Sequence, residues 1–248
     1  MADEPIPVYV RLNAHSLKRA IRSGWDMFSR SRPLSVSYAM VFSLIGLVIL
    51  VGIVQASRAP MIFPLAAGFM FIGPVLLSGF FSLADRLLRK EECSFADVIN
   101  GYKRTSSGMM LVASVCALLF MLWVINIANL YGVMVGRSPV TLLELVSPTT
   151  SILSFLLWTS LLGCFLAFLI FTVSAFSVPL MYYRRAGLVN AVKLSVRAVF
   201  ANIIPSLQWA LILSTGIIVS IVIFPLFLIT FPVLAFASHA LYRELFPD

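Results

Sequence analysis

The polar residues that could do chemistry in this chain are few, and they lie inside long apolar stretches. Asn126 and Asn129 are three residues apart, so both amides fall on one face of a helix. Gln208 and His239 lie in later apolar stretches. Such groups can line a substrate path, but they also form hydrogen bonds between neighbouring helices. We interpret them as helix–helix contacts, because no charged residue lies deep in any apolar stretch and ion-coupled transporters usually need one.

The histidines and cysteines predict no metal or cofactor site. His15 and His239 are the two histidines, and neither has a second ligand at helical spacing, so a haem–copper centre cannot be built. The three cysteines lack the spacing of a zinc site or of a disulfide framework. We interpret Asp85 and Arg86 as the end of a membrane span. The sequence therefore predicts no catalytic residue, no cofactor and no metal, and we expect a protein that is not an enzyme.

The composition is that of a chain whose solvent is lipid. Hydrophobic residues make up 60% of it, charged residues 11%, and the mean hydropathy is +1.01. Soluble domains are about 45–50% apolar and about 25% charged. We therefore expect an all-α polytopic membrane protein, with residues 1–248 forming a single integral membrane domain.

Six stretches are long enough, or nearly long enough, to cross a bilayer, which takes about 20 apolar residues in a helix. Residues 151–183 exceed that length, so we expect a kink near Pro179. Residues 198–242 are uncharged, and we divide them at Pro225 because proline interrupts helical hydrogen bonding. The predicted spans cover residues 35–56, 61–83, 108–131, 151–178, 203–224 and 226–241.

A short, basic, amphipathic segment precedes each pair of spans, which predicts three repeated two-span units. The segments are residues 16–30, 94–104 and 188–201, and the first belongs to a predicted cytoplasmic segment, residues 1–32. Helices of this kind lie in the membrane interface with their bases on lipid headgroups. The bases that we expect to contact anionic headgroups are Lys18, Arg19, Arg22, Lys103, Arg104, Lys193 and Arg197.

Two of the segments carry more detailed signals. One helical face carries an apolar stripe that we expect to enter the acyl chains, formed by Leu17, Ile21, Trp25 and Phe28. In the second segment, Ser94 and Asp97 have the spacing of a capping box, which predicts a helix start there.

The distribution of lysine and arginine predicts the orientation. Of the 18 such residues, all but Arg58 and Arg137 fall on one side of the predicted spans. The positive-inside rule then places both termini in the cytoplasm. The net charge of +8 is explained by this orientation and by anionic lipid, so we expect no nucleic-acid partner.

Prolines recur in the second span of each predicted unit. Pro74 and Pro232 both begin the tripeptide Pro-Val-Leu, and Pro179 lies near the end of the fourth span. With Pro225 they are the predicted helix kinks. Such kinks are often structural, but in transporters they can mark a site or a hinge, and the sequence leaves both readings open.

Four short motifs, spread over most of the chain, carry a resemblance to a known family. They are Gly24-Trp25-Asp26 ahead of Pro33, Gly73-Pro74, Ser195-Val196-Arg197-Ala198-Val199 ahead of Asn202 and Pro205, and His239-Ala240-Leu241-Tyr242-Arg243. With these motifs the chain resembles a family of bacterial predicted integral membrane proteins, a domain of unknown function sometimes loosely labelled oxidase-related. The resemblance implies six spans and a bacterial inner-membrane location. It supplies no site residue, and two histidines argue against a catalytic oxidase.

Two hypotheses of function follow from the sequence. The first is a noncatalytic inner-membrane protein that is an accessory or assembly component of a larger membrane complex, because apolar spans without reactive groups suit that role. The second is a transporter or lipid-handling protein that uses the polar face of Asn126 and Asn129 and the proline-kinked spans. Membrane lipids are expected partners in either case.

Overall fold

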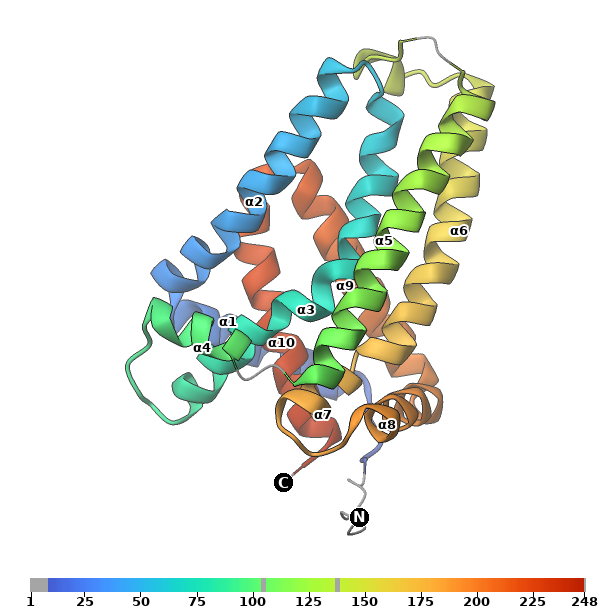
Figure 1. The fold of residues 1–248 in the computed structure, drawn as a ribbon. Coiled ribbons are helices and arrows are strands. Elements are labelled where there is room, and N and C mark those ends of the chain that lie inside the picture. The colour runs from blue at the N-terminus through green and yellow to red at the C-terminus, as the bar shows by residue number, and fades with distance from the viewer. Residues whose placement is uncertain (1–8, 104–105, 137–138, 248) are drawn as a thin grey trace.

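The structure is a computed structural model that describes residues 9–103, 106–136 and 139–247, with only the backbone described for residues 69–75, 222 and 224. These residues form a helical bundle, as expected for an all-α membrane protein (Figure 1). The helices are α1 (Ala14–Arg30), α2 (Arg32–Gln55), α3 (Ile62–Leu88), α4 (Phe95–Lys103), α5 (Ser107–Met134), α6 (Thr150–Ser174), α7 (Ser177–Tyr182), α8 (Leu188–Ala201), α9 (Ile203–Val222) and α10 (Phe227–Leu245), with 3₁₀ turns η1 (Ala59–Met61), η2 (Leu143–Leu145) and η3 (Phe224–Leu226).

Four helical segments of the described chain are long and apolar enough to cross a membrane. They are α2, α5, α6 continued by α7, and most of α9. The other two predicted spans correspond to α3 and α10, which are not among these four. Only the backbone is described for residues 69–75 of α3, and α10 has 19 residues. The bundle is thus a membrane protein with four candidate spans, and the count of six crossings stays a prediction.

Polar side chains fix where several helices begin. Asn13 accepts the Ser16 backbone N–H at 2.9 Å and forms a capping box at the start of α1. Ser106 caps α5 and Thr149 caps α6 in the same manner. Each of these oxygens satisfies a backbone donor that has no partner within the first helical turn.

The start of α4 is held by Asp97, at the position expected from the sequence. Its carboxylate accepts the Ser94 backbone N–H at 2.8 Å, while Ser94 Oγ accepts from Ala96 N rather than from Asp97 N. The other carboxylate oxygen of Asp97 lies 2.8 Å from Arg86 Nε on α3. The capping interaction therefore also ties α4 to the end of α3.

One end of the bundle carries α1, α4, α7 and α8, together with the first described residues and the end of α10 (Figure 1). We call α1, α4 and α8 the collar helices, and this end the collar end. At the other end, the turn after α2 meets the loop between α5 and α6. Val140 N donates to Ser57 O at 2.6 Å, and Ala59 N donates to Val140 O at 3.1 Å, so the two connections are joined.

Each collar helix packs on a longer part of the bundle, and for α4 and α8 the partner directly precedes it in the chain. α4 packs on α3, α8 packs on α6 and α7, and α1 packs on α10. The last contact joins the two ends of the chain, since Val10 N donates to Leu245 O at 2.8 Å. Asn202, between α8 and α9, also holds the segment before α1, because its Oδ1 accepts the Leu12 backbone N–H at 2.7 Å.

Glycines allow two collar helices to approach their partners closely. A Cβ atom at Gly24 of α1 would lie 2.5 Å from the carbonyl oxygen of Val233 on α10. At Gly101 of α4 it would lie 2.6 Å from the carbonyl oxygen of Ser78 on α3. Both distances are shorter than a non-bonded contact allows, so any larger residue must push the helices apart.

The helix breaks at Phe176, between α6 and α7, and α8 satisfies the interrupted backbone. Ser195 Oγ accepts the Phe176 N–H at 3.2 Å and donates to the Thr172 carbonyl at 2.9 Å. Pro179 follows in α7 and has no N–H to bond the carbonyl four residues earlier. The break and the docking of α8 are therefore one arrangement.

The other predicted kink positions have different surroundings. Pro225 lies in η3, between α9 and α10. Pro232 lies inside α10. Pro74 lies within α3, in the part for which only the backbone is described. These three prolines therefore occupy a turn between helices in one case and helix interiors in the other two.

The Gly24→Ala variant is expected to lower the free energy of unfolding by about 1–3 kcal/mol, because its Cβ would meet the backbone of α10. Gly46→Ala in α2 is the matched control, since a Cβ there meets none of the described atoms within 4 Å. The control should be neutral or more stable by up to about 1 kcal/mol. Thermal unfolding in detergent micelles measures both, and equal midpoints would contradict close packing of α1 on α10.

Candidate functional site

The two asparagines of the predicted polar face lie exposed on α5. Asn126 Nδ2 donates to the Leu122 carbonyl of its own helix at 2.8 Å. Asn129 is also exposed, on the same helix. Neither residue lines the two grooves described below. The hydrogen bond of Asn126 therefore stays within α5 and joins it to no neighbouring helix.

His239 is fully buried and belongs to a hydrogen-bonded cluster, which we call the polar junction, formed by Asp85, Tyr183 and His239. The Tyr183 hydroxyl donates to Asp85 Oδ1 at 2.9 Å and lies 2.8 Å from His239 Nε2. His239 Nε2 lies 3.7 Å from the same Asp85 oxygen. The junction thus joins the collar-end parts of α3, α7 and α10.

The electrostatics of the polar junction keep the phenol protonated. Burial raises the pKa of Tyr183, and the negative charge of Asp85 raises this pKa further, so the hydroxyl remains a donor. His239 Nδ1 is buried and has no hydrogen-bond partner among the described residues. Within residues 9–103, 106–136 and 139–247, no three His, Cys, Asp or Glu side chains lie close enough together to hold a metal ion.

Sequence reasoning missed Asp85 and Tyr183 as members of this cluster. Asp85 was interpreted as the end of a span, and Tyr183 was given no role. One signal could have found them, since Asp85 directly precedes Arg86 and Tyr183 directly precedes Arg184. Both residues therefore hold the same place relative to the first arginine after a span.

The predicted headgroup-binding bases differ in what they contact. Lys18, Arg22, Lys103, Lys193 and Arg197 are exposed on the collar helices. Arg19 instead forms an ion pair with Glu244 on α10. Arg104 lies outside the described residues. The collar end therefore presents several exposed cations, while one predicted member is engaged in holding α1 to α10.

A groove of about 780 Å³ runs between α1 and α9, and we call it the α1–α9 groove. Its polar lining residues are Lys18 and Arg22 on α1 and Gln208 on α9. Its apolar walls include Trp25, which is 51% exposed, and Leu211. Three residues that the sequence singled out separately, two as bases and one as an intramembrane amide, thus line one site.

The predicted apolar stripe of α1 is divided between the protein core and this groove. Leu17 and Phe28, at the two ends of the stripe, are buried within the protein, although Leu17 also borders the groove. Ile21 and Trp25 remain exposed beside Lys18 and line the groove. α1 therefore uses one side to pack on α10 and keeps an apolar side open.

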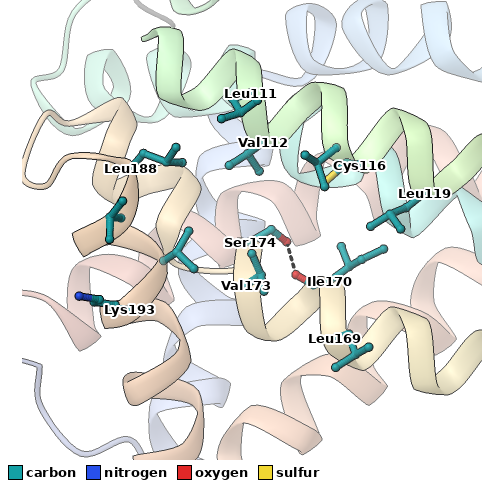
Figure 2. Close-up of a pocket in the computed structure, with 13 residues that line it drawn as sticks. Leu111, Val112, Cys116, Leu119, Leu169, Ile170, Val173, Ser174, Leu188 and Lys193 are labelled. Carbon is teal, nitrogen blue, oxygen red and sulfur yellow. Dashed lines mark hydrogen bonds between the residues drawn. The ribbon is translucent and has the colours of Figure 1, made fainter.

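A second groove, of about 460 Å³, lies between α5, α6 and α8 (Figure 2), and we call it the α5–α8 groove. Its walls are apolar side chains such as Val112, Leu119 and Ile170. Ser174 Oγ is engaged with the Ile170 carbonyl at 2.7 Å. Lys193 lies at the edge of the lining, with its amine directed away from the apolar side chains (Figure 2).

Tyr183→Phe is expected to lower the free energy of unfolding by about 1–3 kcal/mol, because it leaves Asp85 and His239 without the hydroxyl that joins them. Tyr131→Phe is the matched control, since the Tyr131 hydroxyl is buried and has no hydrogen-bond partner among the described residues. It should change stability by less than about 0.5 kcal/mol. Both variants are compared by thermal unfolding in one detergent, and a loss no larger for Tyr183→Phe would refute the role of the junction.

Comparison with known proteins matches residues 62–182 to the model of a family described as "Predicted integral membrane protein (DUF2189)". The match runs from the first residue of α3 to the last residue of α7, about half of the chain. Comparison with curated proteins and with solved structures gave no match. The match supports the family expected from the sequence motifs, and the protein is an integral membrane protein.

Proposed function

We propose that this is a noncatalytic integral membrane protein that binds anionic phospholipid on the cytoplasmic leaflet, with the α1–α9 groove as its site. The observation that carries the proposal is the lining of that groove, where two cations and an amide border an apolar wall. An amphiphile with a negative headgroup has the same division into charged and apolar parts. The proposal develops the lipid-handling hypothesis, and an accessory role in a larger complex stays a prediction.

The cations of the groove are placed to bind one phosphate together. Lys18 and Arg22 are four residues apart on α1, so they lie on the same face one turn apart. Both are exposed, and neither forms an ion pair within the described part of the chain. Arg19 would not compete for the same phosphate, because its guanidinium binds Glu244. Arginine and lysine both bind phosphate well, the former through a planar fork.

The remaining lining suits the glycerol and acyl parts of a lipid. The Gln208 amide on α9 can donate to an ester or phosphate oxygen. Trp25, on α1, lines the groove and is half exposed, and tryptophan favours the boundary between headgroups and acyl chains. The volume of about 780 Å³ lies within the usual range of ligand sites, about 300–1,000 Å³.

The proposed leaflet follows from the side on which the bases gather. The collar helices, which carry the exposed bases, lie at one end of the bundle (Figure 1). The positive-inside rule assigns such an end to the cytoplasm, where anionic lipids attract it. We propose the bacterial inner membrane as the location, with both termini cytoplasmic.

Replacing both groove cations, in Lys18→Gln/Arg22→Gln, should weaken binding of phosphatidylglycerol by about 2 kcal/mol, or about thirtyfold, because each base loses a hydrogen bond to the bound phosphate worth about 1 kcal/mol. Native mass spectrometry of the protein released from vesicles of phosphatidylglycerol and phosphatidylcholine measures the bound lipid. Raising the ionic strength should reduce the difference between the two lipids for the unmodified protein.

The matched control removes two exposed charges from the same end of the bundle without touching the groove. Arg89→Gln/Lys103→Gln serves this purpose, because neither residue lines the groove. It should leave lipid binding within about threefold of the unmodified protein, as expected for screened surface charges. Equal losses in the two double variants would mean that binding depends on overall charge, and the groove would no longer be the site.

Labelling of Cys93 tests the orientation. Cys93 lies in the connection between α3 and α4 at the collar end, so a membrane-impermeant maleimide should modify it in inverted vesicles and not in right-side-out vesicles. Burial raises the pKa of this thiol, and the Asp97 carboxylate raises it further, so the reaction needs alkaline pH. Cys116 and Cys164 are first changed to alanine. Modification from the outside would overturn the proposed orientation.

A further inference from the structure

The α5–α8 groove differs from the α1–α9 groove in its charge and in its size. Among the described residues, Lys193 is the one cation that lines it, whereas the α1–α9 groove has two cations and an amide. Its volume is about 460 Å³ against about 780 Å³. The smaller groove is therefore suited to an occupant with fewer chains and a smaller headgroup.

The walls of the α5–α8 groove offer a ligand almost no polar contact. The two polar side chains besides Lys193 are Cys116 and Ser174, and the Ser174 hydroxyl already donates to the Ile170 carbonyl. A sugar, a nucleotide or a peptide would leave its own polar groups without partners in such a site. Hydrocarbon carries no such cost, so the body of the occupant is an alkyl chain.

Lys193 sets the chemistry of the headgroup. It is exposed at the edge of the lining, and its amine points away from the apolar walls (Figure 2). A lysine in this place keeps its stem on apolar surface and its charge in the headgroup region. One ammonium group neutralises one negative charge, and a carboxylate is the smallest headgroup that supplies it.

We infer that the α5–α8 groove binds one long-chain fatty acid, with the chain along α5 and α6 and the carboxylate at Lys193 of α8. This site is separate from the phospholipid site, because the two grooves have no lining residue in common. α8, which carries Lys193, lies at the collar end (Figure 1), so the carboxylate would lie in the same leaflet as the headgroups that the other collar helices contact.

Photolabelling of the full chain in lipid nanodiscs tests the inference, with a diazirine-bearing palmitic acid as the probe. Peptide mapping should find the label on α5, α6 and α8, and oleic acid should compete while added phosphatidylglycerol should not. Lys193→Gln should weaken labelling at low probe concentration by about fivefold, as expected for one lysine–anion contact at a membrane surface. Lys103→Gln, which removes a charge outside the groove, should leave it unchanged.

A second pair of variants tests the shape of the groove. Val115 lines the groove on α5 and is 48% exposed, while Leu118 on the same helix is 57% exposed and does not line it. Val115→Trp should fill the groove and abolish labelling, and Leu118→Trp should not. Because both side chains are exposed, neither replacement crowds the core.

Several outcomes would overturn the inference. Competition by phosphatidylglycerol as strong as that by oleic acid would identify ordinary boundary lipid, and so would equal labelling of Val115→Trp and Leu118→Trp. Labelling spread over α2 and the exposed face of α5 would do the same. The Lys18→Gln/Arg22→Gln variant should label normally, so failure of the phospholipid site and failure of the fatty-acid site give different results.

Discussion

The Tyr183 hydroxyl joins three helices that are far apart in the chain, and the packing of the collar end depends on it. It donates to Asp85 at the end of α3 and contacts the buried His239 of α10. His239 is fully buried and the other two groups are partly buried, so losing the hydroxyl leaves polar groups with little water to replace it. α3, α7 and α10 are also the helices on which α4, α8 and α1 pack, so this cluster lies among the supports of all three collar helices.

Local signals predicted the helices, while the contacts between them were beyond the sequence. Hydropathy and proline act on residues close together in the chain. The division predicted at Pro225 is an example, because α9 ends just before this residue and α10 begins just after it. The capping role of Asp97 was predictable for the same reason. The pairing of Asp85 with His239 is not local, since it depends on how α3 and α10 pack. A single histidine gives no indication of which distant carboxylate it will meet.

In the candidate site, too, local signals were predictable from the sequence and contacts between helices were not. The bases Lys18 and Arg22 were predictable from amphipathic spacing, but their meeting with Gln208 required α1 to lie beside α9. The expectation that the α1 stripe enters lipid as a whole also needed the structure. Packing on α10 buries one part of the stripe, and what stays open becomes the wall of a groove. An apolar stripe in a sequence does not specify whether protein or lipid will cover it.

The packing of α1 on α10 has a consequence for how the protein is made and inserted. α1 is translated before all the helices that lie between it and α10 in the chain, although α10 is the helix on which it packs. Until α10 has been made, α1 therefore has no protein surface on which to pack. A basic amphipathic helix can lie in the membrane interface during this time. The contact between α1 and α10 therefore forms late, although α1 itself is translated early. The Val10–Leu245 hydrogen bond can form only after α10 has been made, so it joins segments that are separated by most of the described chain.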